Sequence, residues 1–165
     1  MKIEIRKIVR PIDLADYAPE YADADQQIHV WVNPPRQARV DYYEINQEFS
    51  AAANERLALL QAVAKKVAEE SEEDIDPGDL TLDELDLGED VQGTLADIDA
   101  KLEALARRLY GWFAEMWSQG EEQWTTDDVV ALVEACLDAD PALWNWIQDE
   151  HWRLVREHRD GVKKK

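Results

Sequence analysis

The chain has 165 residues, of which 37 are acidic and 18 basic, giving a formal net charge of −19. This length fits one domain, or a small head with a helical body, and is enough to bury a core without metals or disulfides. Because a strongly negative field repels phosphates and anionic lipids, direct binding to DNA, RNA or a membrane surface is not expected.

The cellular compartment is indicated by what the chain lacks. No apolar run approaches the ~20 residues that span a bilayer, and no apolar signal-peptide core follows Met1. The single cysteine, Cys136, lies in an apolar helical stretch between Val129 and Leu137. It is expected to be a small buried hydrophobe rather than a reactive thiol. A reducing, cytoplasmic location is therefore predicted.

The first 35 residues carry strand patterns. Apolar and charged side chains alternate over Lys2–Ile8, and Ile28, Val30 and Val32 alternate in a second block, Ile28–Val32. The segment Pro11–Gln27 between them is rich in Asp, Ala and Pro and is interpreted as a loop. Since two strands alone are marginal, they must pack on helices or join the sheet of another chain.

Two long helices are predicted next, over residues 36–70 and 91–118, separated by an acidic, mobile linker over residues 69–90. The first has apolar residues at mostly three- and four-residue steps: Val40, Tyr43, Phe49, Ala53, Leu57, Leu60, Ala64 and Val67. The second has the strongest periodic signal in the chain: Leu95, Ile98, Leu102, Leu105, Leu109, Phe113 and Met116. Gly120 suits a stop beyond its end.

Two further helices are predicted near the C-terminus. Thr125 and Asp128 have capping-box spacing at the start of one. Asp140 and Pro141 fit the N-cap and first turn of the other, which is expected to end near Asp160. The predicted fold is mainly α: a helical bundle with a small N-terminal β-strand pair, divided into a β element over residues 1–35 and a helical body over residues 36–165.

No catalytic, cofactor-binding or metal-binding residue is predicted. His151 and His158 share one helical face, but the Glu-x-x-His step of carboxylate-bridged metal sites is absent. The acids of Asp74–Asp79 do not match a calcium-loop pattern. Nucleophile-elbow, phosphate-loop and Cys-x-x-Cys motifs are also absent. The sequence therefore favours a binding protein over an enzyme.

The candidate binding surface lies on the last helix. Tryptophan and arginine are enriched in protein interfaces, and Trp152 lies off the apolar stripe that contains Ile147 and His151. The predicted protein-binding residues are Trp144, Trp146, Trp152, Arg153 and Arg156. The alternatives are a helix buried on several sides, and a Trp152 ring that fills a gap between helices.

Charge is distributed unevenly along the chain. Residues 69–103 contain fifteen acidic residues and one base, Lys101, whereas residues 153–165 contain six bases and two acids. An acidic, bent helical body can imitate a nucleic-acid phosphate surface. An inhibitor of the DNA-mimic class, binding a host defence or DNA-binding protein, is therefore one candidate.

Two segments of the chain, residues 10–35 and 138–165, resemble a known group of proteins. The first contains Ile-Asp-Leu-Ala-Asp-Tyr-Ala-Pro-Glu-Tyr and Val-Trp-Val-Asn-Pro-Pro. The second contains Asp-Pro-Ala-Leu-Trp-Asn-Trp-Ile and Val-Arg-Glu-His-Arg, followed by a lysine run. In this order, around an acidic helical body, they resemble tail assembly chaperones of long-tailed bacteriophages.

The resemblance implies a non-enzymatic protein of the host-cell cytoplasm that binds the tape measure protein and helps recruit tail-tube subunits. It implies no cofactor, and it leaves self-association open. A tape measure protein exposes long apolar helical stretches, so its chaperone needs apolar docking surface together with charge for solubility. The tryptophans and the net charge are compatible with that role.

Overall fold

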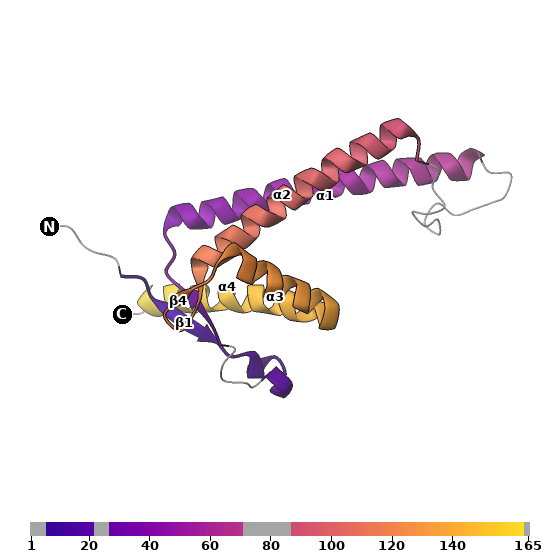
Figure 1. The fold of residues 1–165 in the computed structure, drawn as a ribbon. Helices are drawn as coiled ribbons and strands as arrows, with labels where there is room; N and C mark the ends of the chain where they lie inside the picture. The colour runs from indigo at the N-terminus through magenta and orange to yellow at the C-terminus, as the bar shows by residue number, and fades with distance from the viewer. Residues whose placement is uncertain (1–5, 22–26, 71–86, 164–165) are drawn as a thin grey trace. The chain divides into compact units, whose positions relative to one another are not determined.

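The computed structural model describes residues 6–21, 27–70 and 87–163, and these residues are mainly helical, as predicted. Within them, no helix is long and apolar enough to cross a membrane. Figure 1 shows the elements, which in chain order are β1 (Val9–Ile12), η1 (Leu14–Asp16), η2 (Pro19–Tyr21), β2 (Ile28–Trp31), α1 (Arg36–Glu70), α2 (Glu89–Met116), β3 (Trp117–Gln119), β4 (Glu122–Gln123), α3 (Thr126–Ala139) and α4 (Pro141–Lys163).

The chain divides into two compact units. The first unit comprises Met1–Tyr42 and Leu109–Lys165, and the second unit is Tyr43–Arg108. The N-terminal strands thus share a unit with the C-terminal helices. The predicted acidic linker largely falls on residues 71–86, which lie outside the described residues, and its expected mobility stays a prediction.

The second unit pairs the greater part of α1 with that of α2. Leu95, Ile98 and Leu105 of α2 are buried, which confirms the predicted stripe. The α1 stripe is partly wrong, because Tyr43 and Leu57 are 65% and 53% exposed. The buried side chains of α1 within this unit are Ala64, which belongs to the predicted stripe, and Ile45 and Ala52, which do not. The small side chains of Ala52 and Ala64 let another helix approach closely at these positions.

The sheet of the first unit has the antiparallel order β1-β2-β3-β4. The prediction for β2 is confirmed, with Ile28, Val30 and Val32 all buried. The first strand was predicted at the wrong place: β1 is Val9–Ile12, part of which falls in the expected loop, and Ile8 precedes it. Residues 2–5 of the predicted strand lie outside the described residues.

A proline is tolerated in β1 because of the ladder register. The Val32 N–H donates to the Ile8 carbonyl at 2.9 Å, and Pro11 is paired with His29. Since hydrogen-bonded and non-bonded pairs alternate in antiparallel ladders, the Pro11 nitrogen faces away from β2. The outer edge of β1 therefore lacks a donor at Pro11, which disfavours pairing with a strand of another chain there.

The predicted helix over residues 91–118 ends two residues early, at Met116. Trp117 and Ser118 lie in β3, where Trp117 pairs with Val30 of β2 and Ser118 with Gln123 of β4. The Trp117 side chain is completely buried. Strand pairing and burial of this ring outweigh continuation of the helix. The chain itself thus supplies the additional strands that the N-terminal pair needed.

Gly120 has a φ of +58° and forms the turn between β3 and β4, rather than capping a helix. We expect Gly120→Ala to lower the free energy of unfolding by about 1 kcal/mol, because a Cβ is disfavoured at positive φ. The matched control is Gly93→Ala in α2, where no atom would meet the added Cβ. It should raise stability by up to about 1 kcal/mol. Urea denaturation of both variants measures these changes, and equal effects would contradict the assignment.

The helix starts of the first unit agree with the sequence. Thr125 and Asp128 form both hydrogen bonds of a capping box, and α4 begins at Pro141. However, α4 continues to Lys163, past the expected end near Asp160. Cys136 is buried, as predicted. The core is centred where α2, the sheet and α4 meet, and its largest fully buried side chains are Ile12, Ile28, Val30, Val32, Phe113, Met116, Trp117, Val129, Ile147 and His151.

Candidate protein-binding surfaces

The three tryptophans predicted to bind a partner have different surroundings within the first unit. Trp144 packs edge-on against Phe113, with 5.4 Å between ring centroids. Trp146 contacts Tyr17 at 5.3 Å. Trp152 stacks on Trp112 at 5.7 Å. All three are partly buried and pack against the core.

Trp152 is held by rings on several sides. Besides Trp112, it contacts Tyr42 at 4.8 Å and stacks on His151 at 5.4 Å. Its indole nitrogen is buried and has no hydrogen-bond partner. This packing favours a structural role for the ring, whereas its role in partner binding stays a prediction.

His151 is completely buried beside that ring. Its Nδ1 accepts a hydrogen bond from the Trp117 indole at 3.2 Å, and its Nε2 lies 3.4 Å from the Trp31 carbonyl. This arrangement corresponds to the neutral tautomer that carries its proton on Nε2. Burial lowers the pKa of His151 from 6.5 to about 4. Because both ring nitrogens are engaged, His151 has no lone pair left for a metal ion.

The two predicted arginines differ in their pairing. Arg153 forms ion pairs with Glu150 and Glu157, and its hydrogen bond to Glu150 is the largest cause that raises its pKa. Arg156 is exposed and has no ion pair within the described part of the chain. Of the two, Arg156 is therefore the more available for a partner.

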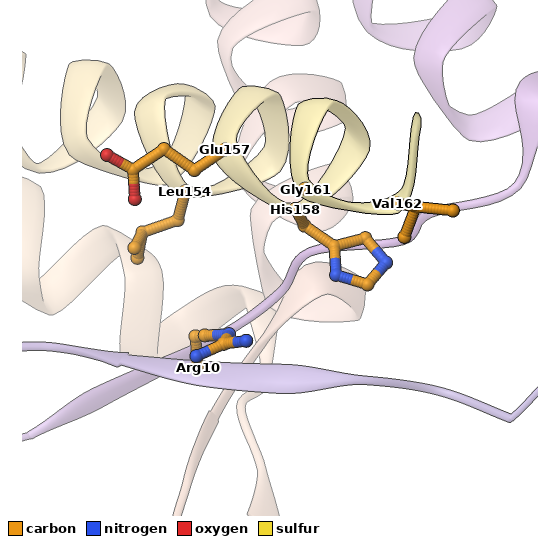
Figure 2. A pocket seen from close by; sticks show the side chains of 6 residues that line it. All are labelled: Arg10, Leu154, Glu157, His158, Gly161 and Val162. Carbon is orange, nitrogen blue, oxygen red and sulfur yellow. The ribbon is translucent and has the colours of Figure 1, made fainter. Parts of the chain in front are cut away.

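A cavity of about 390 Å³ lies between β1 and α4, and Figure 2 shows Arg10 facing Leu154 and His158 across it. Its lining mixes opposite charges, since Arg10 and Glu157 both contribute. The Glu157 carboxylate is already paired with Arg153. Within the described residues, no group of His, Cys, Asp and Glu could hold a metal ion.

A second cavity, of about 350 Å³, forms a mainly apolar groove in the first unit. We call it the α3 groove, because α3 contributes Leu132, Ala135, Cys136 and Ala139. The remaining lining residues come from the N-terminal segment, the β3 end, the segment before α3 and the start of α4: Leu14, Tyr21, Gln27, Ile28, Gln119, Trp124, Asp140 and Leu143.

Among the described residues that line the α3 groove, Asp140 is the single charged one. Its carboxylate accepts a hydrogen bond from the Tyr17 hydroxyl, which lies 3.0 and 2.9 Å from the two oxygens. This bond raises the pKa of Tyr17, while desolvation, followed by the charge of Asp140, raises the pKa values of Tyr21 and Cys136. The groove therefore combines apolar walls with a negative charge at one position.

Known protein families, curated proteins and solved structures provide no match to this chain. The candidate surfaces consequently rest on geometry and chemistry.

The sequence did not identify the α3 groove. Ala135 and Ala139 are small and exposed, and Leu14 and Leu143 are buried. Nothing in their spacing along the sequence distinguishes these four residues from other alanines and leucines of the chain. The one available signal is the high apolar content of residues 129–137, from which only the burial of Cys136 was predicted. That helix buries Val129 and Val133 on one side while adjacent positions line the groove.

Proposed function

We propose that this protein is a non-catalytic tail assembly chaperone of a long-tailed bacteriophage, which binds the tape measure protein and helps recruit tail-tube subunits. The α3 groove is the observation that carries the proposal. It offers an open apolar surface to a helical partner on a strongly acidic protein, the combination of properties that a chaperone for exposed apolar helices needs.

The groove also connects the two segments on which the resemblance rests. Leu14 and Tyr21 come from residues 10–35, and Asp140 and Leu143 come from residues 138–165. Segments far apart in the chain thus contribute to one surface. This supports a shared role for them in binding, beyond their contribution to the fold.

The first test is co-expression with the long helical protein encoded by a neighbouring gene. We expect the two proteins to co-purify, and the soluble fraction of the long protein to increase. Ala135→Trp should abolish co-purification, because Ala135 is exposed and an indole there would fill the α3 groove. Leu137→Ala is the control, because this 59% exposed side chain of the same helix does not line the groove.

The absence of such a neighbouring gene, or a neighbour that does not bind, would contradict the proposal. Stable capture of a host DNA-binding protein would instead favour the acidic inhibitor. Ion pairs in the second unit, Arg56–Asp99 at 2.7 Å and Arg108–Glu48 at 3.0 Å, neutralise acids on its helices. This pairing makes the described helices poorer imitations of a phosphate array.

A further inference from the structure

We infer that the α3 groove binds a polypeptide segment of a partner that carries apolar side chains and a lysine or arginine, whose cation pairs with Asp140. The inference deepens the proposed function and rests on it in treating the groove as a protein-binding site. It adds the chemistry by which the partner is recognised.

The first argument is the unpaired charge of Asp140. Its carboxylate lines an apolar groove, and its described polar contacts are the hydroxyls of Tyr17 and Tyr21, which are neutral. No Lys or Arg in the described part of the chain forms an ion pair with it. Two hydroxyls donate two protons at most, and an ionised carboxylate has about four acceptor sites, so Asp140 keeps lone pairs for a charged donor. A cation from outside the chain would complete its bonding.

The second argument is the charge of the elements around the groove. η1, η2 and α3 together contain six acidic residues and no basic one: Asp16, Glu20, Asp127, Asp128, Glu134 and Asp138. Their field attracts a basic segment and repels an acidic one. The complementary occupant is therefore positively charged beside its apolar residues.

The third argument is the size and openness of the groove. Its volume of about 350 Å³ is at the low end of the ~300–1,000 Å³ range of pockets that enclose a small molecule. Ala135 and Ala139 are exposed on its rim, which leaves space for a backbone to pass above the apolar lining. These features suit a few side chains of a longer segment, with its backbone outside the groove.

The test is an affinity selection of a random 16-residue peptide library on the full chain, with counter-selection on the groove-filled variant Ala135→Trp. We expect the groove-dependent peptides to combine Leu, Ile, Phe or Met with Lys or Arg. Enriched peptides without a basic residue would overturn the inference. The absence of any groove-dependent peptide would overturn it as well.

A double-mutant cycle then tests whether the basic residue of the peptide pairs with Asp140. Asp140→Asn should weaken an enriched peptide by about 10- to 100-fold, the range for losing a charged hydrogen bond. Asparagine has nearly the same shape and its amide oxygen can accept from Tyr17, so the fold should persist. Replacing the peptide's basic residue with Met should weaken binding equally in wild type and have little effect on Asp140→Asn. Independent effects of the two changes would exclude Asp140 as the partner of that cation.

The two proposals can fail separately. Groove-dependent peptides that lack any basic preference would overturn this inference and leave the chaperone function standing. Conversely, selection of basic apolar peptides without binding of the neighbouring long helical protein would reject the chaperone and retain the groove specificity.

Discussion

Trp152→Ala is expected to lower the free energy of unfolding of the first unit by about 3 kcal/mol, within the range for removing a large buried ring. The side chain packs against Tyr42, Trp112 and His151, with ring centroids 4.8, 5.7 and 5.4 Å away. Truncation would leave a cavity between these rings. For a chain of this size, each kcal/mol corresponds to about 2–4 °C, so the melting temperature should fall by about 10 °C.

The matched control is Trp152→Phe, which retains an aromatic ring and removes the indole N–H. That nitrogen is buried without a partner, so its loss has no hydrogen bond to break. We expect a change within about 1 kcal/mol. Thermal melts and urea titrations of the two variants measure the difference between losing the ring and losing its donor.

The same variants decide whether Trp152 also contacts a partner. If its role is purely structural, Trp152→Ala should bind the partner normally at temperatures below its own melting transition. Loss of binding with an unchanged melting temperature would instead place the ring in the interface and contradict the packing argument. Arg156→Ala tests the other predicted interface residue separately. Because Arg156 is exposed, the change should leave the melting temperature unchanged, so any loss of partner binding would report on the interface alone.

The second large effect is pH-dependent and comes from His151. Its pKa is about 4 in the folded protein, because burial disfavours the charged form, against 6.5 in the unfolded chain. Between these values the unfolded state binds the additional proton, so acidification favours unfolding. The contribution is fully present above about pH 6.5 and is lost as the pH falls toward 4. The loss should reach about 3 kcal/mol, since one pKa unit is worth about 1.4 kcal/mol.

His151→Gln isolates this effect from the titration of carboxylates. A glutamine can accept from the Trp117 indole and donate to the Trp31 carbonyl, the two contacts that His151 makes, but it does not titrate. Between pH 7 and 4, the variant should lose about 3 kcal/mol less stability than wild type. Parallel pH profiles would mean that His151 is solvated or charged in the folded state.

The sequence pattern correctly predicted those elements that depend on residues close together in the chain. The α2 stripe was found because its large aliphatic residues repeat at three- and four-residue steps over several turns. Likewise, the capping box at Thr125 and the start of α4 at Pro141 depend on residues only a few positions apart. Strand β2 was recognisable because Ile28, Val30 and Val32 fall at every second position, and the alternating burial in the structure agrees with this pattern.

Predictions failed where a distant segment selected the conformation. Trp117 has a helical neighbourhood in sequence, but pairing with Val30 draws it into β3. In the same way, Tyr43 and Leu57 fit an apolar helical stripe, but small Ala52 lies on the buried face instead. Val9–Ile12 forms β1 because Ile12 pairs with Ile28 and becomes buried.

The sequence by itself determined the mainly helical class, the acidic charge and the positions of the helix starts, because these follow from composition and from contacts a few residues apart. Only the tertiary structure decided which apolar residues form the α3 groove and which rings surround Trp152 and His151. Those arrangements bring together residues more than 100 positions apart, such as Tyr17 with Asp140 and Trp31 with His151. Such pairings depend on how the whole chain packs, and no local pattern encodes them.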